Sequence, residues 1–248
     1  MSLSFARCSL FLALIMPAVS ASAEKIYLYT ENFPPYNMSV NGRAYEHKAD
    51  DIDGLCTEMI KTLMTHTGLD YVMKLRNWGY GYGRALEKEN HGIFCTTYTD
   101  ERAPQFKWVG PLTRNLWTIF APPGSKLKLK DLESAKTMTI GGYRGDVMTD
   151  YLLDRGFNVS QLESDDLNPK RLALKQIDLW IADRLAGPYF ASQQDVDELV
   201  PVYSFNDTEL YLAMSLATPD EIVNRLNAGL EKIRTSGMYS AIEEKWGL

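Results

Sequence analysis

Groups that would support metal binding or covalent chemistry are scarce in this sequence. It has only three histidines, His47, His66 and His91, and their spacing matches no metal-ligand pattern. It also lacks a nucleophile elbow, a Walker loop and a Cys-His pair. Residues 79–83 follow a G-x-G-x-G spacing, but this lacks the third interval and the strand-to-helix context of a dinucleotide fingerprint. We therefore expect no catalytic residue, no bound metal and no cofactor.

An excess of basic residues is also missing. The chain of 248 residues has 26 Lys and Arg against 32 Asp and Glu, a net charge of −6 at pH 7. The densest basic segment, residues 126–130, alternates Lys with Leu, which predicts a strand or linker with one solvated face. A phosphate backbone requires clustered Lys and Arg, so nucleic acid is not an expected partner.

The first 23 residues have the pattern of a secretory signal peptide. One charged residue, Arg7, precedes an apolar run over residues 10–19 and the small residues Ala21, Ser22 and Ala23. Pro17 interrupts the run, which is shorter than the roughly 20 residues of a spanning helix, so a permanent membrane anchor is the weaker alternative. We expect cleavage near Ala23 and a periplasmic protein of one large domain or two modest lobes.

Removal of this segment would leave two of the three cysteines, Cys56 and Cys95. In an oxidising compartment two thiols form a disulfide where their geometry permits it. However, Cys56 lies on the apolar face of an expected helix and Cys95 in an apolar strand, where free cysteine packs as a small hydrophobe. The residues favour two unpaired thiols and leave the disulfide as the alternative.

Strand and helix patterns alternate along the chain. The clearest helix lies between Gly54 and Gly68, where apolar residues recur at helical spacing. The aromatic and Gly-rich residues 78–83 predict a loop before a short helix near Leu86. After Pro111 the alternation restarts, which indicates parallel strands covered by helices in two lobes.

The remaining elements are weaker, apart from the last long helix. Thr218 and Glu221 are expected to form its capping box, with Pro219 at the first helical position. Further helices are expected near 147–155, after 168–169 and at 185–192, and strands at 26–29, 71–75, 92–96, 116–121, 138–141, 178–182 and 208–216.

Arg102 follows the expected strand at 92–96 and the Thr-rich residues 96–99. A guanidinium can hold a carboxylate through two parallel hydrogen bonds, while hydroxyl and backbone N–H groups bind its remaining lone pairs. This arrangement is typical of a site for a small carboxylate. The alternative is a solvated loop arginine that pairs with Asp100 or Glu101.

Several short motifs occur together in one order. The chain has Phe33-Pro34-Pro35-Tyr36 after its first strand, Gly54 opening a helix, and Trp78 before Ala85-Leu86; these precede residues 97–102, 177–183 and 237–239. In this order and spacing, the mature chain resembles the bacterial extracellular solute-binding proteins of the polar amino acid type, family 3, which serve ABC transporters.

The resemblance implies an α/β fold of the periplasmic-binding-protein type 2 (Venus flytrap), with two lobes that close over a ligand. The first lobe would be discontinuous, formed by residues 24–112 and 210–248, and the second would be formed by residues 113–209. Two hinge strands would join them. A ligand that touches both lobes then shifts the balance between open and closed forms.

By position, the resemblance assigns charged ligand contacts to three residues. Arg102 and Thr97 would hold a ligand carboxylate, and Asp183 would accept a ligand ammonium group. Asp183 also suits a helix N-cap after its strand, and this alternative stays open. Cys95, in the strand before Thr97, is included among the residues expected to line the site.

Aromatic and loop residues complete the expected site. Phe33, Tyr36 and Trp78 match positions that form aromatic walls, although core packing is an alternative for each. Gly145 and Asp146 lie in the second-lobe loop that supplies backbone N–H groups to the ligand carboxylate. Asp146 is expected to cap the helix that begins at Val147; if it faces the cleft instead, the ligand should carry an extra cation.

The function that the resemblance implies is binding without covalent change. The expected partners of a monomeric chain are an amino acid or related small carboxylate and an ABC permease in the inner membrane. The alternatives are a ligand-sensing receptor for a sensor kinase or chemoreceptor, and an exported dehydratase on the same fold. The residues do not distinguish transport from sensing or identify the ligand.

Overall fold

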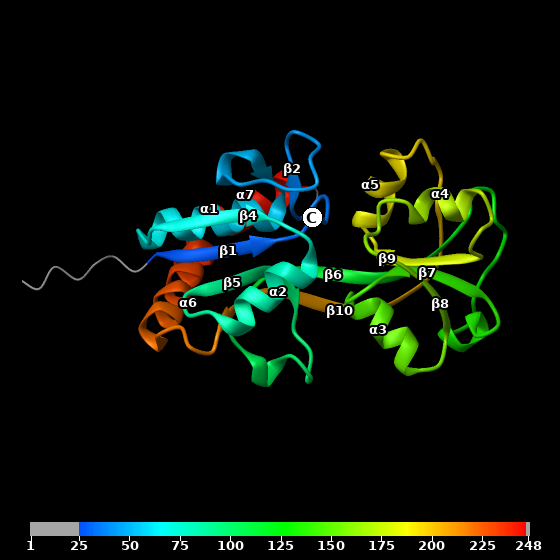
Figure 1. Ribbon diagram of the computed structural model, residues 1–248. Helices are drawn as coiled ribbons and strands as arrows, with labels where there is room; N and C mark the ends of the chain where they lie inside the picture. Colours follow the sequence, from blue (N-terminus) through cyan, green and yellow to red (C-terminus); the bar gives the residue numbers. More distant parts are fainter. Residues whose placement is uncertain (1–24, 247–248) are drawn as a thin grey trace, which may run out of the picture.

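A computed structural model describes residues 25–246 of the chain. The expected signal peptide lies outside the described residues. Figure 1 shows two halves joined by two long strands, and the described residues form one eight-stranded sheet in the order β4-β1-β5-β10-β6-β9-β7-β8. This two-lobed α/β architecture confirms the fold class that the sequence predicts.

The first half contains the parallel strands β4, β1 and β5, with helices on both faces. Helices α1, α6 and α7 bury their apolar residues in one core, and α2 packs Ala85 against the opposite face. The bounds are β1 (Ile26–Thr30), β4 (Tyr71–Leu75), β5 (His91–Thr97), α1 (Leu55–Thr67), α2 (Trp78–Glu87), α6 (Asp220–Thr235) and α7 (Met238–Lys245).

The second half repeats this arrangement around three parallel strands. Helix α3 packs on one face, and α4 and α5 pack on the other. The bounds are β7 (Thr139–Tyr143), β8 (Asn158–Leu162), β9 (Leu179–Asp183), α3 (Val147–Asp154), α4 (Asn168–Ala173) and α5 (Ala186–Ser192). The small strands β2 (Met38–Ser39) and β3 (Ile52–Asp53) form a separate two-stranded sheet, and short 3-10 helices span Ala49–Asp51, Ala103–Gln105 and Leu132–Ala135.

The two halves share the antiparallel strands β6 (Phe106–Ala121) and β10 (Val200–Ser215), which lie at the centre of the sheet. Figure 1 shows both strands passing from one half to the other. On this connection Arg114 of β6 pairs with Asp207 of β10 through two hydrogen bonds of 3.1 and 2.6 Å. The lobe boundaries expected near residues 112 and 210 fall within these strands and stay a prediction.

Helix α1 confirms the strongest helical pattern of the sequence. Leu55, Met59, Ile60 and Leu63 are fully or almost fully buried, and they recur at the spacing that places them on one face. The helix ends at Gly68, whose φ of 65° is a left-handed conformation that glycine adopts without steric cost.

Two local expectations are wrong. The residues expected as a Gly-rich loop belong to α2, which starts at Trp78 because Asn77 accepts a hydrogen bond from the N–H of Tyr80. Gly81 suits this helix because a Cβ there would lie 3.0 Å from the Tyr29 Cβ. At α6 no capping box forms: Pro219 is the N-cap, and the Thr218 hydroxyl instead accepts a hydrogen bond from the N–H of Asn90.

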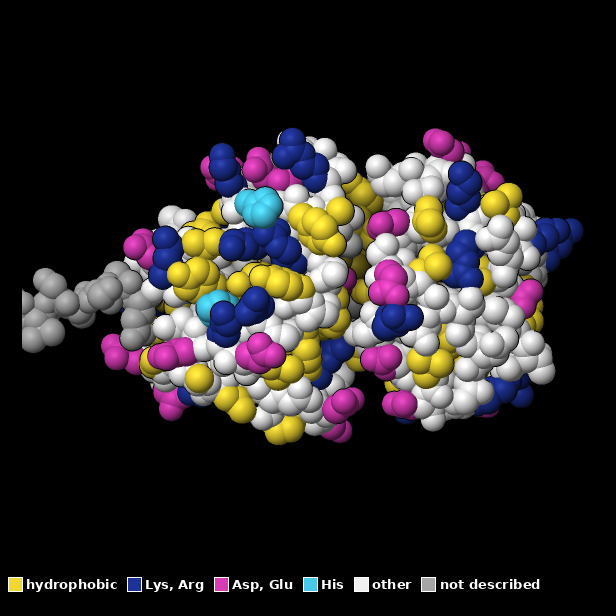
Figure 2. Space-filling view, in the orientation of Figure 1, with side chains coloured by type: hydrophobic (Ala, Val, Ile, Leu, Met, Phe, Trp, Pro, Cys, Tyr) yellow, Lys and Arg dark blue, Asp and Glu magenta, His cyan; other side chains and the backbone are white. Residues whose placement is uncertain are grey.

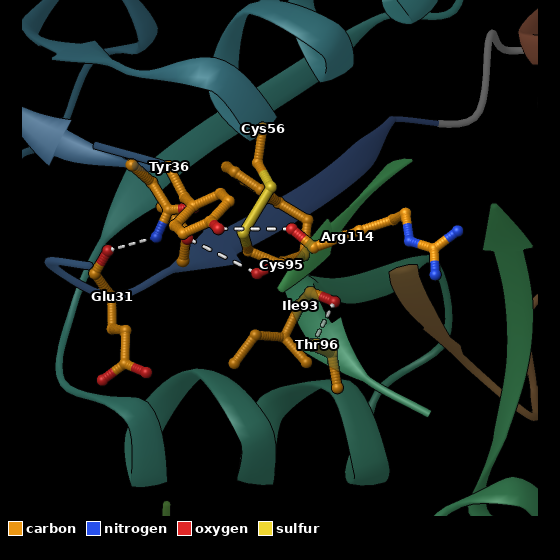
Figure 3. Close-up of a disulfide and its surroundings, with 10 residues drawn as sticks. Glu31, Tyr36, Cys56, Ile93, Cys95, Thr96 and Arg114 are labelled. Atoms are coloured by element: carbon orange, nitrogen blue, oxygen red, sulfur yellow. Dashed lines mark hydrogen bonds between the residues drawn. A yellow bond between two sulfur atoms is a disulfide. The ribbon is translucent and has the colours of Figure 1, made fainter. Parts of the chain in front are cut away.

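The two cysteines are paired, contrary to the favoured expectation of free thiols. A disulfide joins Cys56 in the first turn of α1 to Cys95 in β5, with the Cα atoms 6.0 Å apart (Figure 3). Both residues lie on apolar elements, as the sequence predicts. Their proximity does not follow from local patterns, because 39 residues separate the two cysteines.

Candidate ligand-binding cleft

A cavity lies where the two halves meet, and both halves contribute residues to it. On the face drawn in Figure 2, a groove runs between the halves. The cavity is bordered by the ends of several strands: Thr97 is the last residue of β5, Tyr143 is the last residue of β7, and Glu31 follows β1. Its lining consists of Glu31, Phe33, Trp78, Cys95, Thr97, Arg102, Asn115, Tyr143, Asp146, Val147, Met148 and Leu210.

Arg102 lies in this cavity, in the turn after β5. The turn is fixed by hydrogen bonds from the N–H groups of Arg102 and Ala103 to the hydroxyl and carbonyl of Thr99. The guanidinium carbon lies 5.3 Å from the centre of the Trp78 ring and 5.5 Å from that of Tyr82, distances that permit cation–π contacts. Within residues 25–246, Arg102 forms no ion pair, so the alternative of pairing with Asp100 or Glu101 is not observed.

Phe33 and Trp78, two of the three expected aromatic walls, border the cavity together with Thr97. Tyr36 does not line it. Tyr36 is 1% exposed, stacks on Phe33 with ring centres 5.1 Å apart, and donates a hydrogen bond to the carbonyl of Arg114. Core packing, the alternative that the sequence left open, therefore describes Tyr36, which supports the ring of Phe33 from behind.

Glu31 is a cavity residue that was not among the site residues expected from the sequence. Its carboxylate accepts a hydrogen bond of 3.1 Å from the Tyr143 hydroxyl of the other half. Desolvation, with a further contribution from the nearby Asp146 charge, raises the pKa of Glu31 to about 8. Glu31 immediately follows a parallel strand, and side chains at the carboxyl ends of parallel strands converge on binding sites. This position is the signal that could have identified it.

Asp146 combines the two roles that the sequence presented as alternatives. It caps α3, because its carboxylate accepts a 3.0 Å hydrogen bond from the N–H of Thr149, and it also lines the cavity. Burial raises the pKa of Asp146 to about 6, although the hydrogen bonds from Thr149 and the charge of Arg102 favour the ionised form. The cavity therefore holds a second acidic group.

Gly145 lies beside the cavity rather than in its lining. Its φ of 77° is a left-handed conformation, and a Cβ there would approach Trp78 Cδ1 to 3.3 Å. Its carbonyl oxygen lies 3.5 Å from a guanidinium nitrogen of Arg102. The expected N–H contact of this loop with a ligand stays a prediction, whereas the contact of Gly145 with the first half is observed.

Asp183 lies outside this cavity. Its two carboxylate oxygens accept hydrogen bonds from the backbone N–H groups of Leu116, Leu185 and Ala186, at 2.8 to 3.0 Å, and the side chain is fully buried. It borders a separate pocket together with Tyr36 and Arg114. Burial raises the pKa of Asp183 despite these three hydrogen bonds. The structure thus brings Arg102 and Thr97 together with Glu31 and Asp146, and it does not add Asp183 to the group.

Two further residues of the cavity were missed. Asn115 of β6 accepts hydrogen bonds from the Trp117 indole and the Thr208 hydroxyl, so its orientation is fixed by both hinge strands. Tyr143 ends β7, and burial raises the pKa of its hydroxyl well above the ordinary value. Asn115 follows Thr113 and Arg114 in an extended run with no recognisable motif, and Tyr143 directly precedes the loop of Gly145 and Asp146 that drew attention instead.

The cavity is narrow and has more acidic than basic groups. Its volume of about 30 Å³ is far below the roughly 300 to 1,000 Å³ of a site that encloses a small molecule. The bond between Glu31 and Tyr143 and the contact between Arg102 and Gly145 each join one half to the other at this cavity. An amino-acid-sized molecule therefore requires the halves to move apart. Such a molecule would then meet one guanidinium and two carboxyl groups.

Two lobes, two connecting strands and a polar cavity between the lobes define a hinged ligand-binding protein. A family model confirms this class over nearly the whole chain: the model of the bacterial extracellular solute-binding proteins, family 3, matches residues 26–248. The chain therefore belongs to this family. Within residues 25–246, no helix has the length and apolar character needed to cross a membrane.

Solved structures share the fold at low sequence identity. A histidine kinase sensor domain with similarity to periplasmic binding proteins is 21% identical, with a TM-score of 0.80, over 90% of this chain and 96% of that one. An ancestral arginine-binding protein bound to arginine is 19% identical, with a TM-score of 0.77, over 90% and 98%.

A third solved structure comes from a thermophile. The arginine-, lysine-, histidine-binding protein ArtJ from Geobacillus stearothermophilus is 19% identical, with a TM-score of 0.76, over 90% of this chain and 95% of that one. Among curated proteins, none matches the chain significantly. At these identities the structures establish the shared fold alone.

Proposed function

We propose that this chain is a periplasmic receptor that captures an amino acid with a cationic side chain by hinge closure and delivers it to an ABC permease. One observation carries the proposal: Arg102 shares a cavity with two carboxyl groups, Glu31 and Asp146, which come from opposite halves. Arginine-binding proteins with the same fold support an amino acid of this class. The ligand leaves the site chemically unchanged.

Each charged group has a complementary role in the proposal. Arg102 and the Thr97 hydroxyl bind the ligand carboxylate, Asp146 binds its α-ammonium group, and Glu31 binds its side-chain cation. Closure excludes water from these contacts, and Coulomb interactions are stronger in the drier cavity than in water. The cationic group of the ligand also takes the place of the proton that Glu31 holds because of its raised pKa. The expected ammonium contact of Asp183 is left out, because three backbone N–H groups already occupy its carboxylate.

Calorimetry with L-arginine, L-lysine, L-glutamine and L-glutamate tests the proposal. We expect wild-type protein to bind arginine or lysine most tightly. Truncating one partner of a buried charge pair costs roughly 2 to 5 kcal/mol, so Arg102→Ala should remove most of the affinity. Arg144→Ala is the matched control, because Arg144 is an exposed arginine of the adjacent loop that pairs with Glu163.

The variant Glu31→Gln tests the class of the ligand separately from the carboxylate contact of Arg102. It should weaken arginine and lysine at least tenfold and leave glutamine within about threefold, because glutamine has no side-chain cation for Glu31 to bind and keeps its α-ammonium contact with Asp146. Unchanged arginine affinity in Arg102→Ala would overturn the carboxylate assignment. Equal losses for arginine and glutamine in Glu31→Gln would overturn the cationic class.

A sensing role is the second candidate, because the histidine kinase sensor domain has the same fold. Transport and sensing use the same hinge and cavity, and they differ in the partner of the closed form. Uptake of radiolabelled arginine into permease-containing vesicles, with and without this protein, distinguishes them. Stimulated uptake supports delivery to a permease, and absence of uptake despite tight binding favours sensing.

A further inference from the structure

Strand β5 carries one extra residue two positions before Thr97, which lines the cavity. Phe94 pairs with Leu212 of β10, and Thr96 pairs with the neighbouring Tyr211. Strand β5 therefore contains one residue between these two pairs that has no counterpart in β10. Cys95 is the inserted residue of this bulge. A bulge changes which residues of a strand face each side. Ile93 packs in the core beneath α2, whereas Phe94 and Cys95 both pack against the core beneath α1.

The bulge requires a backbone conformation that cysteine disfavours. The φ of Cys95 is 64°, in the left-handed region, where the Cβ of an L residue meets the carbonyl oxygen. Glycine is the usual residue at such a bulge position. A non-glycine residue is disfavoured there by roughly tenfold. The conformation of Cys95 therefore needs support from its surroundings.

The disulfide supplies a covalent support at this position. Cys95 is bonded to Cys56, whose N–H donates a 2.9 Å hydrogen bond to the carbonyl of Tyr36 in the turn after β1. The cross-link therefore ties the bulge to the turn that carries Phe33. Figure 3 shows the disulfide beside Tyr36, Ile93 and Thr96, and the Thr96 hydroxyl donates to the carbonyl of Ile93 across the bulge.

We propose that the Cys56–Cys95 disulfide is a positioning element of the binding site, which holds the bulge that directs Thr97 into the cleft. Cys95 and Thr97 both line the cavity, as residues two apart on a strand do, and Arg102 follows in the next turn. Without the cross-link, residue 95 favours an ordinary extended conformation, which would turn Thr97 and displace the segment that leads to Arg102.

Two double variants separate positioning from the general effect of a cross-link. Cys56→Ala with Cys95→Ala and Cys56→Ala with Cys95→Gly both lose the disulfide. They differ only at residue 95, where glycine adopts the left-handed conformation freely and alanine does not. Amide hydrogen exchange of Thr96 and Thr97 is measured in the unliganded proteins, at a temperature where thermal unfolding curves show all three to be folded.

We expect exchange at Thr96 and Thr97 to rise about tenfold in the alanine variant and to stay near the wild-type rate in the glycine variant. Equal exchange in both variants overturns the proposal, whether both match the wild type or both exceed it. If the alanine variant does not fold, wild-type protein reduced with a phosphine under native conditions replaces it, and should show the same rise. Unchanged exchange after reduction overturns the proposal.

Affinity for L-arginine is the second readout, and it rests on the proposed function. The alanine variant should bind about tenfold more weakly than the glycine variant, which differs from it only at residue 95. Restored affinity in the glycine variant cannot arise from cross-linking, because this variant has none. If the wild type itself fails to bind arginine, the ligand class is wrong, and the exchange measurement alone decides the role of the disulfide.

Discussion

Two aspartates of the second half occupy similar local positions and have different surroundings. Asp146 follows β7 and caps α3, and Asp183 ends β9 and binds the N–H groups that lead into α5. Asp146 faces Arg102 and Glu31 of the first half across the cavity. Asp183 instead faces the hinge strand β6, where it accepts the N–H of Leu116. The same local motif therefore places one carboxylate in the cavity, where we propose a ligand contact, and uses the other as a structural anchor.

The largest expected effect tests the anchoring role of Asp183. Asp183→Ala leaves three N–H groups, one buried and two partly buried, without their acceptor, and each buried unpaired group costs about 1 to 3 kcal/mol. We expect the free energy of unfolding in urea to fall by at least about 3 kcal/mol, with the arginine affinity of the folded fraction unchanged. Intact stability combined with lost arginine binding would return Asp183 to the ligand site.

The second effect tests Asp146. Asparagine caps helices as well as aspartate does, so Asp146→Asn should keep the stability within about 0.5 kcal/mol. The same change removes a charge that faces the ligand, and we expect a loss of about tenfold or more in arginine affinity. Titration calorimetry and thermal unfolding of one preparation measure both quantities. A drop in stability with unchanged affinity would make Asp146 a cap only.

The third effect is a pH dependence of the free energy of unfolding, which arises from the carboxyl groups of the cavity. The pKa of Glu31 is raised from 4.5 to about 8, so between these values the folded protein holds a proton that the unfolded chain has released. Stability is therefore greatest below about pH 4.5 for this group and falls as the pH rises towards 8. One proton gives a slope of at most about 1.4 kcal/mol per pH unit.

Glu31→Gln is the variant that checks this slope. Urea unfolding between pH 5 and 8 should give a shallower decline than in the wild type, because the titrating group is gone. A residual decline is expected from Asp146 and Asp165, whose pKa values burial raises to about 6 and about 7. Identical slopes in the two proteins would mean that Glu31 does not hold a proton in the folded state.

The smallest effect concerns the exposed ion pair between the hinge strands. Arg114 and Asp207 have exposed side chains, 65% and 52%, and such pairs contribute about 0 to 1 kcal/mol. Arg114→Ala should change stability by less than about 1 kcal/mol and leave arginine affinity within about threefold. A tenfold change in affinity would show that this pair controls the balance of open and closed forms.

Much of the fold could be predicted from the sequence, because apolar spacing is a local property. The buried face of α1, with Leu55, Met59 and Leu63, follows directly from residues three or four apart. The end of α1 at Gly68 follows in the same way. The start of α2 was missed, because three glycines in residues 78–83 suggest a loop. The cap at Asn77 starts the helix, and the close approach of Gly81 to Tyr29 explains why glycine suits it.

The part of the candidate site that could be predicted is the part where a chemically distinctive side chain, such as the Arg102 guanidinium, follows a strand. Arg102, Thr97, Phe33 and Trp78 meet in the cavity, as the sequence and its family resemblance indicated. Glu31 was missed because a carboxylate in a turn has many ordinary explanations. Its role depends on Asp146 and Tyr143, which lie more than 110 residues further along the chain.

The sequence by itself determined the alternating elements, the family and the guanidinium that follows β5, because these depend on neighbouring residues and on the order of short motifs. Only the tertiary structure decided which acids share the cleft with Arg102 and that Cys56 pairs with Cys95. The physical reason is that both outcomes depend on distances between segments remote in the chain, which packing of the sheet and its helices fixes.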